Sequence, residues 1–319
     1  MSATLVRTPP QATTLKQIPD ALAKLWRACL PDEQCLPGGQ GGDVSRALTI
    51  NFVGIAEASD EQALRAAVER LQRRSPCRAF LLFVNAPGKE VAAEISATTR
   101  GQGATRDIVL EEIVIRVPQG GFEQIPGLLR PLLVNDLPNH LYWGLGWPKD
   151  EGQFDELSGL CDHTVVDTAH FATPAKNLPL LQQRRAQGAR LTDLSWLRLR
   201  PWRRALAEAF ERVPWQKGSS TTCAIRHGKH GEAAARLLGD WLTERLGAKL
   251  KLEADGKEGG TGPVHVKLLT GGFELELSVA QQQVVAHLTT PEHCYLPFKV
   301  PTPRSSDGDL LAAAIDMDS

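Results

Sequence analysis

The fold is decided by two apolar stretches, ALTINFVGI at residues 47–55 and CRAFLLFVN at residues 77–85. Neither alternates with polar residues, which is typical of strands buried on both faces of a parallel sheet. Ser59 and Asp60 cap a helix between them. The apolar positions of that helix recur at the spacing of one face: Leu64, Ala67, Val68 and Leu71. This order predicts a βαβ unit within a parallel sheet.

Further elements extend this unit in the C-terminal direction. VAAEISATTR (91–100) and DIVLEEIVIRV (107–117) alternate, which predicts strands with one wetter face near a sheet edge. The next elements expected are a leucine-rich helix over 126–134, a strand within DLPNHLYWGLGWP (136–148), a helix over 154–160 and the strand HTVVDT (163–168). We therefore expect a three-layer α/β domain with a mostly parallel sheet over residues 45–180.

The two flanking regions differ from this domain. Residues 1–44 predict a helix capped by Asp20 followed by a glycine-rich linker. Beyond residue 180, an arginine-rich segment leads to a helix that begins at Pro201 and to a second helix over 231–246. The period then becomes two, in KLKLEAD (249–255), VHVKLL (264–269), FELELSV (273–279) and QVVAHL (283–288). Residues 181–319 are thus expected to form an α+β domain with an antiparallel meander and a final helix starting near Asp307 or Asp309.

Composition limits the possible partners. The chain has 36 basic and 37 acidic side chains, so it has no overall field that would attract nucleic acid or an anionic membrane. Its apolar runs are too short to cross a bilayer, and its first residues, MSATLVRTPPQATT, have no apolar signal-peptide core. We expect a cytoplasmic protein with no membrane or nucleic-acid partner.

The six cysteines are scattered without a CxxC pair, which argues against a disulfide scaffold or a zinc ribbon. Reduced thiols are expected. A regulatory disulfide between Cys29 and Cys35 is the alternative. Cys29, however, continues the apolar stripe of Leu22, Leu25 and Trp26, where a buried thiol acts as a small hydrophobe.

No segment predicts a cofactor, metal or catalytic site. The glycines at 38–42 precede a strand and lack the lysine of a phosphate loop. Cys223, His227 and His230 have ligand-like spacing for a helix, but glycines interrupt that segment and favour a strand that leads into a loop. His163, with Asp162 and Asp167 nearby, is interpreted as a solvated residue at a strand end.

Two features stand out as binding candidates. The first is the aromatic strand end, where Trp143 or Tyr142 should be core and Trp147 follows Gly146 in a loop at the end of the sheet. The second is LRLRPWRR (197–204), whose forked donors could bind a phosphate or an acidic protein surface. The alternative for this segment is a solvated helix with arginine stems lying over tryptophan.

The order of several segments resembles OpcA, the family of glucose-6-phosphate dehydrogenase assembly proteins. The segments that carry the resemblance are ALTINFVGI, SPCRAFLLFVN, LRPLLVNDLPNHLYWG, LCDHTVVDT and TDLSWLRLRPWRRALAEAF, in that order. Family members commonly carry Asn where Ser195 stands here, and the polar pair Asn139-His140 also departs from the family pattern.

The resemblance implies a non-catalytic protein that binds glucose-6-phosphate dehydrogenase and promotes its assembly or activates it allosterically. Exposed tryptophan and arginine are frequent interface anchors. The residues we expect at the partner interface are Trp143, Trp147, Arg198, Arg200, Trp202 and Arg203. The alternative function is a sugar-phosphate- or nucleotide-binding enzyme or sensor that uses the crevice of the α/β sheet.

Overall fold

The computed structural model describes residues 4–28, 43–102, 105–133, 136–148, 150–213, 215, 219–256, 260–302 and 306–317. Cys29, Cys35 and the glycine-rich linker lie outside these residues, so the predictions about them stay untested. The described residues form two compact units, one extending to Val166 and including the C-terminal helix, the other covering residues 167–306. Each unit is described by itself.

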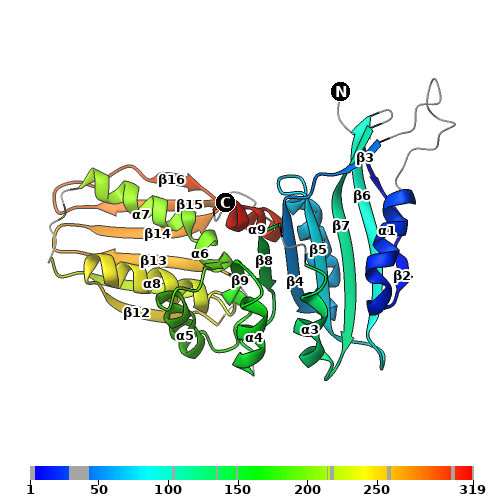
Figure 1. The fold of residues 1–319 in the computed structure, drawn as a ribbon. Helices are drawn as coiled ribbons and strands as arrows, with labels where there is room; N and C mark the ends of the chain where they lie inside the picture. The colour runs from blue at the N-terminus through cyan, green and yellow to red at the C-terminus, as the bar shows by residue number, and fades with distance from the viewer. Residues whose placement is uncertain are drawn as a thin grey trace. The chain divides into compact units, whose positions relative to one another are not determined.

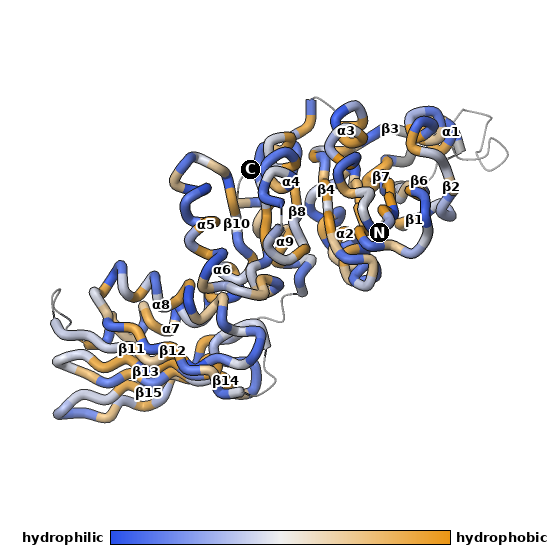
Figure 2. Tube along the Cα trace, turned by 90° about the horizontal axis from the view of Figure 1, so that it is seen from below, coloured by the Kyte–Doolittle hydropathy of each residue, from blue (hydrophilic) through white to orange (hydrophobic). Residues whose placement is uncertain are grey.

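The first unit is built on the predicted βαβ unit (Figure 1). Strand β4 (Ile50–Glu57) leads through helix α2 (Glu61–Leu71) to β5 (Cys77–Ala86), and the two strands pair in parallel. The four apolar positions expected on α2 are its buried residues. Every residue of β4 up to Ala56 is buried, which agrees with a strand covered on both faces. Figure 2 shows the hydrophobic residues that run along β4 and β7.

The sheet of this unit has the strand order β1-β6-β7-β5-β4-β8-β9. Strands β7, β5, β4, β8 and β9 are parallel, and β1, β2 and β6 are antiparallel to their neighbours, so the predicted mostly parallel sheet is confirmed. The strands not yet placed are β1 (Thr4–Arg7), β2 (Gln11–Thr13), β3 (Asp43–Arg46), β6 (Ala92–Gln102), β7 (Thr105–Pro118), β8 (Asn139–Trp143) and β9 (His163–Val166). The remaining helices of the unit are α1 (Ile18–Ala28), α3 (Ile125–Leu129), α4 (Glu151–Ser158) and α9 (Asp307–Asp316).

The prediction that residues 107–117 form a strand near the sheet edge is wrong. β7 lies between β5 and β6, and both of its central glutamates are buried. Glu111 pairs with Arg46 and Arg78, while Glu112 pairs with Arg7 and Arg65. These arginines neutralise the carboxylates, which allows a strand of alternating polarity to occupy the interior.

Glu111 and Glu112 also show that the unit has three layers. Neighbouring residues of a strand point to opposite faces. Arg46, bound to Glu111, lies over the ring of Trp26 from α1, whereas Arg65, bound to Glu112, comes from α2. Helices α1 and α2 therefore cover opposite faces of the sheet, as the predicted three-layer arrangement requires.

Several helices differ from the prediction. Helix α1 begins at Ile18, so Asp20 lies within its first turn and does not cap it, and α4 covers Glu151–Ser158 instead of 154–160. Helix α3 ends at Leu129 because Pro131 follows and cannot supply the amide that continues the helix. The C-terminal helix α9, expected with the second domain, packs on α2 in the first unit. A Cβ on Gly308 would lie 2.8 Å from the Cα of Ala67, so the two helices approach closely there.

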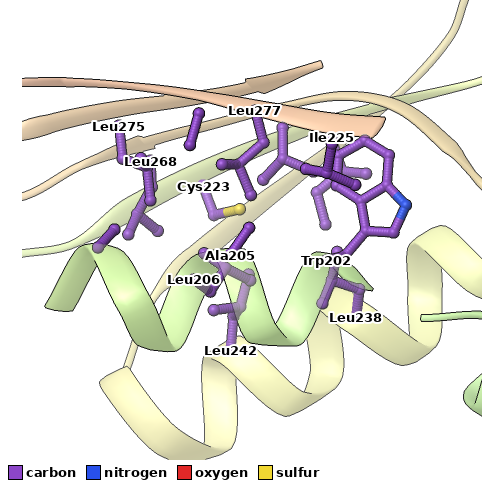
Figure 3. Packing of buried hydrophobic residues seen from close by; sticks show 14 of the residues in the cluster. Trp202, Ala205, Leu206, Cys223, Ile225, Leu238, Leu242, Leu268, Leu275 and Leu277 are labelled. Atoms are coloured by element: carbon purple, nitrogen blue, oxygen red, sulfur yellow. The ribbon is translucent and has the colours of Figure 1, made fainter. Parts of the chain in front are cut away.

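In the second unit, helices cover one face of a six-stranded sheet. The sheet order is β12-β11-β13-β14-β15-β16. Its strands are β11 (Thr222–His227), β12 (Lys249–Ala254), β13 (Pro263–Leu269), β14 (Glu274–Ala280), β15 (Gln283–Thr289) and β16 (Phe298–Pro301). The other elements are β10 (Leu191–Asp193), α5 (Pro174–Ala186), α6 (Leu194–Arg198), α7 (Arg200–Arg212) and α8 (Glu232–Leu246). In Figure 3 the apolar side chains of α7 and α8 point toward those of the strands.

The meander is confirmed for β13, β14 and β15, which pair antiparallel in sequence order, and β16, which was not predicted, extends it. The prediction that 249–255 belongs to it is wrong, since β12 pairs in parallel with β11. The long helix α8 connects these two strands, and a crossover of this length brings the chain back in the same direction. Helix α8 ends where predicted, at Gly247, whose φ of 66° is left-handed.

Candidate binding site

A pocket of about 450 Å³ lies at the carboxyl edge of the sheet in the first unit. Parallel strands β7, β5, β4 and β8 all end at this edge. The pocket is lined by residues from the ends of these strands and from the segments that follow them: Glu57, Val84, Asn85, Gly120, Phe122, Trp143, Leu145, Gly146, Trp147, Pro148, Asp150 and Gln153. The aromatic strand end singled out in the sequence is therefore part of a concave site.

The topology explains why a pocket forms here. Strand β4 has β5 on one side and β8 on the other. The chain first builds outward from β4 through β5 and β7, and then returns to the other side of β4 to form β8 and β9. Such a reversal of strand order leaves a crevice at the carboxyl ends of the strands, which is where open α/β sheets bind ligands.

Trp143 is the buried aromatic centre of the pocket wall. Its side chain is 2% exposed. Its ring makes edge contacts with Phe122 and Phe154, with centroid separations of 6.0 Å and 5.1 Å, and its indole N–H donates to the carbonyl of Gly146 at 3.0 Å. This satisfies the one polar group of the ring. The expectation that Trp143 or Tyr142 is core is confirmed for Trp143.

Trp147 lies nearer the solvent than Trp143. It is half-buried and stacks on Phe154 with a centroid separation of 6.4 Å. Its indole N–H donates to Glu151 Oε1 at 3.3 Å. The loop position after Gly146 thus gives Trp147 a fixed orientation together with partial exposure.

The lining of the pocket also includes polar groups. Asn85, with a left-handed φ of 53°, donates its side-chain amide to Glu57 Oε2 at 2.9 Å. Asp150 caps α4 by accepting from the backbone N–H of Gly152 at 2.9 Å. Among the described residues that line the pocket, two are carboxylates and none is lysine or arginine. The pocket therefore combines aromatic surface with negative charge.

Gly144 sets the path of the chain into the pocket. Its N–H donates to the carbonyl of Ile55 at 2.8 Å. A Cβ at this position would lie 2.8 Å from that same oxygen and 2.8 Å from the ring of Tyr142. Only glycine allows the strand end to approach β4 this closely.

The arginine-rich segment belongs to the second unit, where a buried pair of carboxylates organises it. Asp193 caps α6 by accepting from the N–H of Ser195 at 2.9 Å, and it also accepts from the hydroxyl of Thr168. Burial, and then the nearby charge of Asp167, raise the pKa of Asp193 to about 6.

Arg198 forms a two-pronged ion pair with Asp167. Both N···O distances are 2.7 Å, and the Asp167 side chain is 2% exposed. Burial alone would raise the pKa of Asp167, but the hydrogen bonds and charge of Arg198 outweigh it and hold that pKa below its usual value. Arg198 thus stabilises the unit from within.

Two other residues of this segment that we expected at the interface also make contacts within the chain itself. Trp202 is 4% exposed and points into the core of the second unit, between α7 and the sheet (Figure 3). The guanidinium carbon of Arg203 lies 3.9 Å from the ring centroid of Trp196. Burial lowers the pKa of Arg203. This contact agrees with the alternative interpretation in placing an arginine over a tryptophan, but the guanidinium and not the stem lies over the ring, and the helix is not solvated, since Trp202 is buried. Arg200 is exposed on the first turn of α7.

Of the two predictions about histidines, the one for His163 is wrong and the one for the segment of Cys223 and His227 is confirmed. His163 is not solvated: it is 2% exposed, and its Nδ1 lies 3.3 Å from Nδ1 of His140 on the adjacent strand. Cys223 and His227 lie on β11, as the strand interpretation predicted. Among the described residues, no group of three or more His, Cys, Asp or Glu side chains could hold a metal ion. The described part of the chain also has no helix long and apolar enough to span a membrane.

Sequence reasoning missed several residues of the pocket. Glu57 ends β4, Asn85 lies near the end of β5, and Phe122 follows β7. Each comes after an apolar strand that the sequence revealed, so a rule that inspects the residues at the carboxyl ends of parallel strands would have found Glu57 and Asn85. Phe122 and Asp150 lie in connecting segments, and no sequence signal marks them.

The fold and the pocket define an α/β protein with a crevice at the carboxyl edge of a mostly parallel sheet, joined to an α+β unit. Family models described as the glucose-6-phosphate dehydrogenase subunit N-terminal and C-terminal domains match residues 68–183 and 189–319. The chain belongs to this family, the OpcA family of glucose-6-phosphate dehydrogenase assembly proteins. The border between the two family domains lies close to the predicted division after residue 180, while the compact units divide at Val166.

Two curated relatives share the family name. An OxPP cycle protein OpcA of Nostoc punctiforme is 30% identical over 66% of this chain and 44% of its own length. The OpcA of Synechocystis is 28% identical over 54% of this chain and 37% of its own length. The matched region therefore spans less than half of either relative.

Among solved structures, the 3-ketoreductase KijD10 of Actinomadura kijaniata, in complex with NADP and TDP-benzene, aligns with a TM-score of 0.48 at 12% identity, covering 85% of this chain and 88% of that one. An oxidoreductase of Sinorhizobium meliloti aligns with a TM-score of 0.46 at 12% identity, covering 84% and 82% of the two chains. Scores of this size carry no argument about function.

Proposed function

We propose that this chain is a non-catalytic cytoplasmic protein that assembles or allosterically activates glucose-6-phosphate dehydrogenase, the enzyme at the entry to the oxidative pentose phosphate pathway. The observation that supports the proposal is the match of both family domains to residues 68–183 and 189–319. The OxPP cycle names of the two relatives agree with it.

An activator must bind the active conformation or assembly of the enzyme more tightly than the inactive one, because equal affinity shifts no equilibrium. This requires a contact surface with residues that a partner can reach. Of the expected interface residues, Trp147 and Arg200 retain exposure, and Arg203 is partly accessible. Trp143 and Trp202 are buried, and Arg198 is paired with Asp167. We therefore assign these three residues chiefly to the stability of the fold.

The alternative, a sugar-phosphate or nucleotide site in the sheet crevice, has little support from the pocket. Phosphate sites use backbone N–H groups at a glycine-rich turn or forked arginine donors. The turn after β4 reads Glu57-Ala58-Ser59-Asp60, without glycine. The charged groups among the described lining residues are carboxylates, which repel a phosphate.

The direct test mixes the chain with the glucose-6-phosphate dehydrogenase of the same organism. We expect a complex on a sizing column, together with a higher kcat, a lower KM or a larger enzyme oligomer. No complex and no change in rate, substrate affinity or oligomer size would refute the proposal.

A pair of variants makes this test specific. W147A should leave the fold intact and weaken the complex by about 2 kcal/mol, or about 30-fold in Kd, as is common for a tryptophan anchor. The matched control is L296A, which removes an 87% exposed large hydrophobic side chain that does not line the pocket. If both variants bind like the unmodified chain, Trp147 is not part of the interface.

A further inference from the structure

The pocket combines three properties that together select one kind of ligand. Its walls carry the rings of Phe122, Trp143 and Trp147, its rim carries the carboxylates of Glu57 and Asp150, and the described lining residues include no cationic group to neutralise them. Aromatic faces attract cations through their quadrupole, and carboxylates do so through charge and hydrogen bonds.

The two carboxylates have acceptor capacity to spare. Glu57 uses Oε2 to accept from Asn85, and Asp150 uses Oδ1 to accept from the backbone of Gly152. Within the described part of the chain, the remaining oxygens, Glu57 Oε1 and Asp150 Oδ2, have no hydrogen-bond partner. Each can therefore accept an N–H from a ligand without giving up its existing contact.

We infer that this pocket binds the guanidinium group of an arginine side chain presented by the partner protein, an inference that rests on the proposed function for the identity of that partner. A guanidinium is planar, so it can stack on an aromatic ring while its fork of donors meets a carboxylate. The pocket volume of about 450 Å³ is at the small end for ligand sites, which suits one long side chain. The apolar residues Leu145 and Pro148 provide a surface for the methylene stem.

The pocket position fits a protein ligand. Trp147 is partly exposed on a loop, and arginine and tryptophan are among the residues that contribute most to binding energy at interfaces. The carboxylates that attract the arginine would repel the phosphate of the enzyme's substrate, so the site is suited to the partner and not to its substrate.

The first experiment titrates the full chain with Nα-acetyl-arginine methylamide and follows the tryptophan indole N–H signals by NMR. The matched probe is Nα-acetyl-citrulline methylamide, which has nearly the same shape without the charge. We expect saturable shifts of the Trp143 and Trp147 signals with arginine at millimolar concentration, and none with citrulline or inorganic phosphate. Equal binding of citrulline, or no binding of arginine, would overturn the inference.

Variants locate the binding. E57Q and D150N keep the hydrogen-bonding shape of each residue and should each weaken arginine binding about three- to tenfold, between the losses typical of a solvated ion pair and of a buried charged hydrogen bond. E156Q removes an exposed carboxylate of α4 that does not line the pocket and should leave the titration unchanged. Unchanged affinity in both E57Q and D150N would overturn the inference.

The same variants, mixed with glucose-6-phosphate dehydrogenase, decide the source of the cation. We expect E57Q and D150N to weaken the complex while E156Q does not. If they lose the arginine probe but form the complex normally, the pocket serves a free organic cation, and the assignment to the partner is refuted while the proposed function stands. If the unmodified chain forms no complex at all, the proposed function fails and the assignment to that enzyme fails with it, whereas the titration still reports the chemistry of the pocket.

Discussion

Replacing Arg198 by alanine should destabilise the second unit strongly, whereas the same replacement at Arg200, two residues later, should not. The Arg198 side chain is 16% exposed and holds Asp167, which is 2% exposed, through two hydrogen bonds of 2.7 Å. Without the arginine, the carboxylate stays buried and has lost its main countercharge. Arg200 is exposed to solvent, and the interactions of an exposed arginine contribute little to stability.

The size of the effect follows from the burial of the pair. Removing one partner of a buried ion pair costs about 3–5 kcal/mol. Because Arg198 is slightly exposed, water can partly replace it, and we expect a loss near the lower end, about 3 kcal/mol. At about 2–4 °C for each kcal/mol in a unit of this size, the Tm of the second unit should fall by roughly 10 °C.

The assay is urea and thermal unfolding of the full chain, followed by far-UV circular dichroism and tryptophan fluorescence. The two units can unfold in separate transitions, so each transition is fitted by itself. The double variant R198A/D167N should recover much of the loss, because it leaves no charge unpaired. A loss below about 1 kcal/mol in R198A, or equal losses in R198A and R200A, would refute the argument.

The pH dependence gives an independent check of the same pair. The pKa of Asp167 is lowered in the folded state, so its contribution to stability is present above about pH 4 and is lost as the pH falls through the folded value. R198A should therefore differ most from the unmodified protein at neutral pH and converge with it in acid. A difference that stays constant down to pH 3 would show that the arginine acts through packing alone.

Three further predictions test other parts of the structure. The pKa of Asp193 is raised to about 6, so the stability associated with its protonation is lost as the pH rises from about 4 to 6; D193N should remove this slope, and its Tm should at least equal that of the unmodified protein at pH 7.5. G144A should lose about 1–3 kcal/mol because its Cβ meets the carbonyl of Ile55, whereas G127A, with nothing within 4 Å of its Cβ, should lose nothing in the same melts. W143A should lose about 3–5 kcal/mol in urea unfolding, since it empties a buried aromatic site.

The sequence predicted those parts of the fold in which local pattern and burial agree. The apolar runs of β4 and β5, and the stripe on α2, are buried as predicted because nothing competes with the hydrophobic pattern. The prediction that residues 107–117 lie near the sheet edge was wrong because two glutamates give β7 the alternating pattern of a half-exposed strand. Their countercharges come from arginines as distant in sequence as Arg7 and Arg46, and a local pattern holds no information about such pairs.

The candidate site was predicted only in part, because a local pattern shows which residues are near one another in the sequence and not which ones the fold brings together. The aromatic strand end was visible because Trp143 and Trp147 are rare residues close together in the chain. The polar rim was not, because Glu57 and Asp150 are ordinary residues that meet only when parallel strands and their loops assemble at one edge. The arginine segment looked like a surface because its charges are dense, yet Arg198 is neutralised by Asp167, which lies thirty-one positions earlier in the chain.

The residues that identify the family and the residues suited to bind a partner are largely different sets. In the SPCR segment, Cys77 is fully buried, and Arg78 donates to Glu111 at 2.6 Å and to the carbonyl of Leu132 at 3.2 Å. In the DLSWLRLRPWR segment, Asp193 caps a helix while Trp202 fills a core. These motifs maintain the fold. Partner preference would then depend on residues outside the motifs, so substitutions at the rim of the pocket should change which protein is bound and leave stability almost unaltered.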